Sequence, residues 1–346
     1  MSELDLDIDE RLSSQYIDLL SERLGGRAIQ TSDEWFAPAE NLLKPGRGIY
    51  KDDYYVSSGK WMDGWESRRS FGRKSGLNGE EYFDLTILRM GARGTIQRFD
   101  IDTNHFRGNA PNYVAVDAIN TRNEPNQQSG WIEVVPKVPV KPHSQNFFDC
   151  NDDRCWTHLR LRIYPDGGVA RFRAYGNAMI VKQDFAEGEL VDLASAINGG
   201  QGIDASDRFF SSPTNLIMPG RGKDMGDGWE TKRRRDSKND WAIIRLGIIG
   251  SIRKVLVDTA HFKGNYPDKM SLEAINLKSE KDLHSSDEWD TVIAECPLYP
   301  DREHIYVEQV LTDDSCQYTH VRLNIYPDGG ISRLRIFGMP DWSTAP

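Results

Sequence analysis

The sequence predicts an all-β protein made of two tandem β-sandwich domains, of jelly-roll or related topology, that arose by internal duplication. Three observations lead to this fold class. The chain has 346 residues, and at about 150 residues per domain two domains are expected. Several long motifs occur twice in the same order, and their spacing far exceeds the roughly 20 to 50 residues of solenoid units. The prevailing hydrophobic period is two, which is typical of strands.

The duplicated motifs define the domain boundaries. They read Asp-Gly-Trp-Glu-x-(Arg/Lys)-Arg, Asp-Thr-x-His-Phe-(Arg/Lys)-Gly-Asn and Tyr-Pro-Asp-Gly-Gly. Their positions are 63–69 and 227–233, 102–109 and 258–265, and 164–168 and 326–330. From them we expect an N-terminal tail at 1–14, a first repeat at 15–176, a linker at 177–188 and a second repeat at 189–346.

Short runs of alternating or branched apolar residues predict the strands of each repeat. The clearest of these runs lie at 159–163, 241–246, 254–257, 271–275 and 321–325. Helical periodicity is convincing only at 12–20, and short turns are expected after Pro38 and Pro213. A doubly wound α/β fold is excluded, because the sequence does not offer the crossover helices that parallel strands need.

Composition excludes several classes of partner. The net charge of -10 and the sequence pI near 5.3 argue against binding to nucleic acid or to an anionic membrane surface. The sequence offers no apolar run of the roughly 18 to 20 residues that a membrane-spanning helix requires, and its N-terminus does not resemble a secretory signal.

Four cysteines without any glycosylation sequon suit a reducing cytoplasm. Cys150 and Cys155 are expected to be ordinary thiols rather than metal ligands.

The last motif of each repeat is surrounded by arginines. If Asp166 and Gly167 are the central residues of a hairpin turn, arginines before the turn face arginines after it. The residues concerned are Arg160, Arg162, Arg171 and Arg173 in the first repeat, with Arg333 and Arg335 in the second. Because like charges repel across strands, this face needs carboxylates from the fold or a bound anion. A salt-bridged sheet face and a carboxylate-binding site are both consistent with the pattern.

The other two motifs supply candidate acid–base groups. The segment 102–109 carries a carboxylate, an imidazole, a cation and an amide in a loop after a predicted strand, where sites are often built. A histidine such as His105 transfers protons near neutral pH, and Asp102 could fix its tautomer. The same set could hold a divalent cation, and a purely structural histidine is the alternative. Trp65 and Trp229 are expected to anchor the core or loops.

These motifs, each present twice, resemble those of the allantoicase (allantoate amidinohydrolase) family, and the resemblance runs from about Tyr16 to Gly338. It implies two tandem jelly-roll domains similar to galactose-binding-like modules, and a cytosolic protein of purine and ureide catabolism that forms homo-oligomers. The implied reaction is the hydrolysis of allantoate to ureidoglycolate and urea. Some members of the family respond to Mn²⁺, but the resemblance assigns no metal to this chain.

That reaction needs a cation for the substrate carboxylate, polar groups for the ureido arms and an acid for the departing urea. The resemblance and the residue types together give candidates from each repeat. For the carboxylate they are Arg69 or Arg233, helped by Arg171, Arg173, Arg333 and Arg335, and for a ureido group they are Asn109 or Asn265. For acid–base catalysis they are His105 or His261, oriented by Asp102 or Asp258, with Glu66 or Glu230 orienting water.

The sequence does not choose between the repeats. Either repeat could hold the site, and a single site between the repeats or across a subunit interface is equally consistent with the motifs. The alternative function is a non-catalytic tandem carbohydrate- or ligand-binding module, which β-sandwiches commonly form. Sugar binding would require exposed aromatic platforms, so Trp65 and Trp229 would have to lie open beside the acidic residues.

Overall fold

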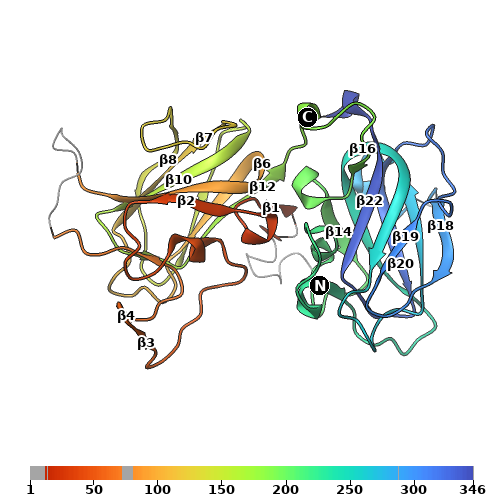
Figure 1. Ribbon diagram of the computed structural model, residues 1–346, viewed down its shortest axis with the longest axis horizontal. Coiled ribbons are helices and arrows are strands. Elements are labelled where there is room, and N and C mark those ends of the chain that lie inside the picture. Colours follow the sequence, from red (N-terminus) through yellow and green to blue (C-terminus); the bar gives the residue numbers. More distant parts are fainter. Residues whose placement is uncertain (1–11, 14, 72–80, 287, 346) are drawn as a thin grey trace. The chain divides into compact units, whose positions relative to one another are not determined.

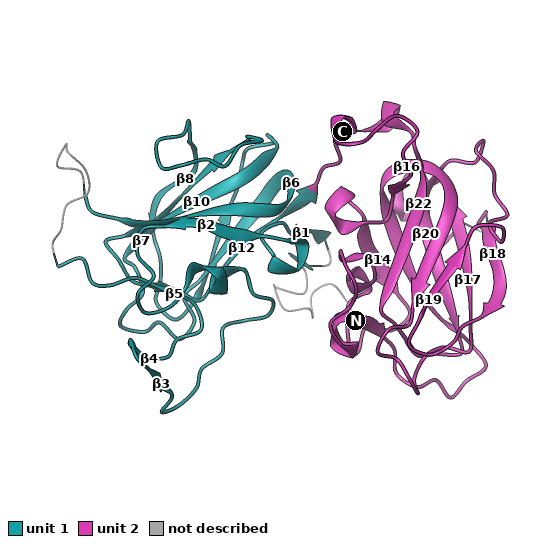
Figure 2. Ribbon diagram, viewed as in Figure 1, with its two compact units in different colours: residues 1–177 teal, residues 178–346 magenta. Residues whose placement is uncertain are grey.

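The computed structural model describes residues 12, 13, 15–71, 81–286 and 288–345. The chain divides into two compact units between Asn177 and Ala178 (Figure 2). Beyond residue 15 the regular elements of both units are strands and short 3₁₀ helices (Figure 1), so the predicted fold of two tandem all-β domains is confirmed. Within the described residues, no helix has the length and apolar character of a membrane-spanning segment.

The first unit is built on a sheet of eight strands. Its strands are β1 (Ile17–Asp18), β2 (Arg27–Thr31), β3 (Tyr55–Val56), β4 (Gly59–Lys60), β5 (Trp65–Glu66), β6 (Asp84–Asp102), β7 (Tyr113–Ile119), β8 (Ile132–Pro139), β9 (Gln145–Asp149), β10 (Trp156–Tyr164), β11 (Gly168–Val169) and β12 (Arg171–Ala178). Its 3₁₀ helices are η2 (Glu22–Leu24) and η3 (Ala39–Leu43). The strand order is β1-β12-β6-β10-β7-β8, with β2 and β9 also paired to β6. The pairs β3–β4 and β5–β11 form separate short ladders.

The second unit repeats this plan. Its strands are β13 (Val191–Asp192), β14 (Gln201–Ala205), β15 (Trp229–Glu230), β16 (Asp240–Asp258), β17 (Lys269–Ile275), β18 (Asp290–Pro297), β19 (Glu303–Tyr306), β20 (Tyr318–Tyr326), β21 (Gly330–Ile331) and β22 (Arg333–Pro340). Its 3₁₀ helices are η4 (Lys182–Asp184), η5 (Ala196–Asn198), η6 (Pro213–Ile217), η7 (Met225–Asp227), η8 (Glu280–Asp282) and η9 (Trp342–Thr344). The sheet order, β13-β22-β16-β20-β17-β18, matches that of the first unit strand for strand.

One long strand in each unit belongs to both layers of the sandwich. In β16, residues 240–245 pair with β20, whereas residues 250–258 pair with β22. Where the strand changes partners, Gly247 lies so close to the η5 loop that an added Cβ would be 2.0 Å from the Asn198 carbonyl oxygen. A side chain cannot fit there. The strands predicted separately at 241–246 and 254–257 are therefore two halves of one element.

The other local predictions are mostly confirmed. The strands predicted at 159–163, 271–275 and 321–325 lie within β10, β17 and β20. The turns predicted after Pro38 and Pro213 are the 3₁₀ helices η3 and η6. The helix predicted at 12–20 is wrong over its second half, because Ile17–Asp18 forms β1 and pairs with β12.

The hairpin predicted around Asp166 and Gly167 does not form. The strand before it, β10, pairs with β6 and β7, whereas the strand after it, β12, pairs with β1 and neighbours β6. The chain crosses here from one layer to the other, so Arg162 does not face Arg171. Arg160 and Arg162 instead both donate to Asp117 on β7, each at 2.8 Å.

Alternation along the strands builds the core. In β10, Leu159, Leu161 and Ile163 are fully buried, whereas Arg160 and Arg162 between them are partly exposed. The buried side chains remove apolar surface from water, which is the main favourable contribution to folding. The strands thereby form a rigid support for the loops that carry the duplicated motifs.

Candidate active site

The three duplicated motifs of each unit are in contact with one another. In the first unit β5, from the Asp-Gly-Trp-Glu motif, pairs with β11, which begins in the Tyr-Pro-Asp-Gly-Gly motif. Phe106, from the remaining motif, packs on Gly168, where an added Cβ would be 2.0 Å from the ring. Phe262 and Gly330 repeat this contact in the second unit, at 1.9 Å. Only glycine leaves room for the ring, so the glycine fixes the relative position of the loops.

The two motif tryptophans are buried anchors. Trp65 and Trp229 are both fully buried. The Trp65 Nε1–H donates to the carbonyl of Asp33 at 2.8 Å, and the Trp229 Nε1–H donates to the carbonyl of Asp207 at 3.0 Å. This confirms the anchoring role predicted for them, and neither ring can serve as an open platform for a sugar.

The Pro-Gly-Arg-Gly loop orients His105. Arg47 donates to the buried carboxylates of Asp100 and Asp102 at 2.6 and 3.0 Å. The carbonyl of Gly48, the next residue, lies 3.0 Å from Nε2 of His105. Because a carbonyl oxygen can only accept, Nε2 carries a proton, and Nδ1 is the acceptor nitrogen of the neutral ring.

The predicted orienting role of Asp102 is therefore corrected. The carboxylate of Asp102 accepts from the backbone N–H of Asn104 at 2.7 Å and from Arg47, whereas the ring of His105 bonds a carbonyl group. A fully buried carboxylate is stabilised better by a guanidinium charge than by a neutral imidazole. Asp102 thus acts on His105 indirectly, through the loop that Arg47 holds and through the backbone of Asn104, the residue before the histidine.

The backbone and one face of His105 are also held in place. Its φ angle is 72°, in the left-handed region that few residues other than glycine adopt, although histidine is among the more tolerant. The backbone N–H of His105 donates to Nδ1 of His143 at 2.9 Å. The ring of Tyr50 stacks on the imidazole, with ring centroids 5.6 Å apart. Neither Tyr50 nor His143 belongs to the motifs from which the site was predicted.

Glu66 and Asn109 form the second half of the site. The Nδ2–H of Asn109 donates to Oε1 of Glu66 at 2.8 Å. Burial raises the pKa of the Glu66 carboxyl, while this hydrogen bond and the charge of nearby Arg69 oppose the rise. Arg69, predicted to bind the substrate carboxylate, is exposed and lies outside the lining of the cavity described next.

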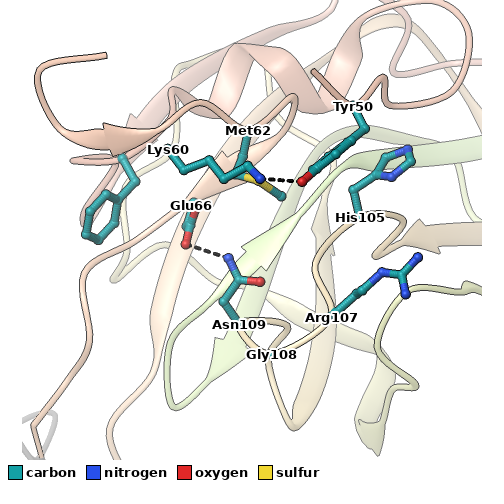
Figure 3. A pocket seen from close by; sticks show the side chains of 9 residues that line it. Tyr50, Lys60, Met62, Glu66, His105, Arg107, Gly108 and Asn109 are labelled. Carbon is teal, nitrogen blue, oxygen red and sulfur yellow. Dashed lines mark hydrogen bonds between the residues drawn. The ribbon is translucent and has the colours of Figure 1, made fainter. Parts of the chain in front are cut away.

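These groups surround a cavity of about 450 Å³ in the first unit, within the usual range for small-molecule sites. Figure 3 shows the side chains that line it. They are Phe36, Tyr50, Lys60, Met62, Glu66, His105, Arg107, Gly108 and Asn109. The predicted residues Glu66, His105 and Asn109 are thus brought together, and exposed Arg107 and Gly108 lie at the solvent side.

Part of the lining comes from an insertion that only the first repeat contains. Between the Pro-Gly-Arg-Gly and Asp-Gly-Trp-Glu motifs the first repeat has residues 49–62, whereas the second has only residues 223–226, ten fewer. The inserted segment forms the β3–β4 ladder and contributes Tyr50, Lys60 and Met62 to the cavity. The unequal spacing of the motifs was the signal in the sequence that could have identified this segment.

The predicted hairpin arginines of the first unit are structural. Arg171 is only 2% exposed, and its Nη2 donates to the carboxylate of Asp63 at 2.6 Å. Arg173 donates to Asp18 at 3.1 Å and to the carbonyl of Gly46. Both guanidinium groups therefore fix loops around the site and lie outside the lining of the cavity.

The arginines of the second unit have the same role. Arg333 donates to the carboxylate of Asp227 at 2.8 Å. Arg335 lies 3.7 Å from Asp192 and donates to the carbonyl of Gly220 at 2.8 Å. Of the two interpretations that the sequence left open for these arginines, the structure shows the salt-bridged one.

The second unit has the same three residue types in a different setting. Asn265 donates to Glu230 at 2.6 Å, and Nε2 of His261 lies 2.8 Å from the carbonyl of Gly222. However, Nδ2 of Asn265 also lies 3.9 Å from the sulfur of Met225, which belongs to the short loop that replaces the insertion. An apolar side chain thus stands beside the amide that would face a substrate.

The remaining predicted residues of the second unit do not join this cluster. Both oxygens of Asp258 accept from Arg221, at 3.0 and 3.2 Å, whereas a single oxygen of Asp102 accepts from Arg47. Arg233 is exposed. The orienting role predicted for Asp258 is therefore corrected for the same physical reason as that of Asp102.

The residues predicted as an option for metal binding do not form a ligand set. Across the part of the chain that the structure describes, no group of three or more His, Cys, Asp or Glu side chains could hold a metal ion. The carboxylates of Asp102 and Asp258 are engaged by Arg47 and Arg221.

The protein is a duplicated β-sandwich whose loops bring His105, Glu66 and Asn109, residue types common in hydrolase active sites, around one cavity. A family model described as the allantoicase repeat matches residues 17–179 and again residues 191–341. The chain therefore belongs to the allantoicase family.

Individual relatives support this assignment. The chain is 41% identical over 328 residues to a probable allantoicase of Pseudomonas syringae pv. syringae, which covers 94% of this chain and 96% of the relative. It is 40% identical over 331 residues to probable allantoicase 1 of Burkholderia mallei, covering 94% and 95%. The crystal structure of allantoicase from Saccharomyces cerevisiae superposes with a TM-score of 0.79 at 35% identity, covering 98% of this chain and 99% of that one.

Proposed function

We propose that this chain hydrolyses allantoate to ureidoglycolate and urea in the cavity of its first unit. One observation carries the assignment to this cavity. Around it lie an imidazole of fixed tautomer, a carboxyl group of raised pKa and an amide, from His105, Glu66 and Asn109. Membership of the allantoicase family supports the choice of substrate.

The reaction replaces one ureido group on the central carbon of allantoate by a hydroxyl group. The oxygen of water bonds to that carbon, the bond from the carbon to one ureido nitrogen breaks, and this nitrogen takes up a proton and leaves as urea. In this proposal His105 accepts the proton of the water at Nδ1, and Glu66 gives a proton to the departing nitrogen. Because burial raises the pKa of Glu66, its protonated form persists to higher pH than that of a free carboxyl.

Asn109 has two roles in this proposal. One N–H of its amide donates to Glu66, which fixes the carboxyl group. Its carbonyl oxygen is then available to accept from a ureido N–H of the substrate. The equivalent residues His261, Glu230 and Asn265 stand beside Met225 instead of an inserted segment, so we assign the chemistry to the first unit.

The alternative of a non-catalytic sugar-binding module is not favoured. It required open aromatic platforms at Trp65 and Trp229, and both rings are buried. The cavity is lined instead by His105 and Glu66, whose side chains are of types that can transfer protons.

We also propose that the protein acts in the cytoplasm and as a homo-oligomer. Its four cysteines and the absence of a glycosylation sequon suit a reducing compartment, and the family resemblance implies oligomers. Sedimentation of the purified protein would measure the oligomeric state, and a monomer at all concentrations would contradict this part of the proposal.

The proposed activity is tested by urea release from allantoate. The purified protein is treated with a chelator and assayed with and without added Mn²⁺. Activity without metal is expected, because the proposed acid and base are side chains. Activity only with Mn²⁺ would make the Asp and His side chains candidate ligands, and no urea under either condition would contradict the proposed function.

A further inference from the structure

We infer that Lys60 binds the carboxylate of the substrate, and that the inserted segment 49–62 restricts this mode of binding to the first unit. The inference rests on the proposed function, since it concerns the same cavity. Lys60 lies outside all of the duplicated motifs.

The charges around the cavity point to Lys60. The proposed substrate is an anion, and its carboxylate needs a cation within the cavity. The arginines predicted for this purpose are not among the residues that line the cavity. Arg171 and Arg173 are buried against Asp63 and Asp18, and Arg69 is not part of the lining. Lys60 is part of the lining, as are Glu66 and His105, and its ammonium group points toward the hydroxyl of Tyr50 (Figure 3).

Tyr50 positions the ammonium group of Lys60. Nζ of Lys60 donates to the hydroxyl of Tyr50 and lies 4.5 Å from the centroid of its ring. An ammonium group has three donors, so two remain for the oxygens of a carboxylate after this bond is made. The same tyrosine stacks on His105. The inserted segment therefore connects the carboxylate-binding cation directly to the proposed base.

Arg107 is the other cation of the lining, and it is less suited to this role. It is exposed, and its Nη2 lies 3.3 Å from Nε2 of His143 at the rim. Charges at an exposed rim are screened by water and salt. Its position is also occupied by a cation, Lys263, in the second repeat, whereas Lys60 belongs to the insertion that the second repeat lacks.

The test compares Lys60→Met and Lys60→Arg with a matched control, Lys51→Met. Lys51 lies in the same segment, but its ammonium group packs on the rings of Tyr54 and Trp61 and not in the cavity lining. The substrates are allantoate and its carboxamide, which keeps the shape but lacks the charge. KM and kcat are measured by urea release, and inhibition constants replace KM where the carboxamide is not turned over.

We expect Lys60→Met to raise KM for allantoate about 10- to 100-fold, the usual effect of a hydrogen bond to a charged group. The KM or inhibition constant of the carboxamide should not change in Lys60→Met. For allantoate, Lys60→Arg should have a KM between those of Lys60→Met and the wild type, and Lys51→Met should behave like the wild type. Thermal unfolding of each variant verifies that it is folded.

Two results would overturn the inference while leaving the proposed function intact. The first is an unchanged KM for allantoate in Lys60→Met. The second is an equal rise in the KM or inhibition constant of the carboxamide in Lys60→Met, because Lys60 would then only shape the cavity. In contrast, a wild-type protein that releases no urea from allantoate contradicts the proposed function itself.

Discussion

Replacing Glu66 by glutamine tests the proposed proton donor with little change of shape. Glutamine keeps an Oε1 that can accept the 2.8 Å hydrogen bond from Asn109, but it cannot protonate the departing urea. A positioned acid–base group contributes about 10²- to 10⁴-fold to the rate, which corresponds to roughly 2.7–5.4 kcal/mol of activation free energy. We expect kcat to fall by this factor while KM changes little, because the binding contacts remain.

The pH profile provides a second readout of the same substitution. Burial raises the pKa of the Glu66 carboxyl, so the protonated acid is present at higher pH than in a free glutamate. As the pH rises through this pKa the acid is lost, and kcat should decline. Initial rates of urea release from allantoate, measured across the pH range, should show this decline in the wild type and not in Glu66→Gln.

Glu230→Gln is the matched control, because Glu230 accepts the same hydrogen bond from Asn265 in the second unit. It should leave kcat close to the wild-type value. The reasoning is refuted if folded Glu66→Gln keeps kcat within about tenfold of the wild type. Equal losses in both variants would instead show that both units are active.

Three further results are expected. His105→Ala should lower kcat of urea release by about 10²- to 10⁴-fold, whereas His261→Ala should keep a kcat close to that of the wild type. Unchanged turnover in both variants would show that neither histidine takes part in the mechanism. Arg171→Met leaves the buried carboxylate of Asp63 without its partner and should lower the free energy of unfolding in guanidinium chloride by about 3–5 kcal/mol, so a loss of less than about 1 kcal/mol would contradict a buried ion pair. Burial raises the pKa of Asp192 from 3.8 to about 6. The folded protein therefore binds this proton more tightly than the unfolded chain. As the pH rises from 3.8 to about 6, the free energy of unfolding should decrease, and this group should cause no further decrease above that range. A series of denaturation measurements in which Asp192→Asn shows the same decrease would contradict this expectation.

The local features of the fold were predictable because they depend on neighbouring residues. Alternation gave the strand at 159–163, and the prolines gave the turns after Pro38 and Pro213. Strand pairing was not predictable in the same way, because a period of two identifies a strand without identifying its partner. The strands on either side of Asp166, β10 and β12, are near in sequence, yet they do not pair with each other and both neighbour β6. Their counterparts β20 and β22 pair with different parts of β16.

The residue types of the candidate site were predictable from the sequence. Which charged side chains face the cavity and which form buried ion pairs was not. His105, Glu66 and Asn109 line one cavity, as their loop positions suggested. The sequence was consistent with Arg171 beside a substrate carboxylate or beside a buried aspartate, since it does not show which groups lose contact with water. Only the fold, which buries Asp63 beside it, decides between the two.

Comparison of the two repeats carries information that one repeat alone does not. Shared residues, such as the arginines at 47 and 221, mainly hold the architecture in both units. The residues at 49–62, which are not shared, supply the ring and the ammonium group of the cavity wall. Under the proposal, the segment that differs between the copies therefore supplies the cation for the substrate carboxylate.

The carbonyl group that holds His105 affects the energetics of turnover. The neutral imidazole and the imidazolium ion both carry a proton on Nε2, so the bond to Gly48 at 3.0 Å is compatible with either state. A proton gained or lost at Nδ1 thus requires no flip of the ring and no exchange of its partner. Under the proposed mechanism the dipole that faces the imidazole is already aligned with the charged form, which keeps the reorganisation energy of proton transfer small.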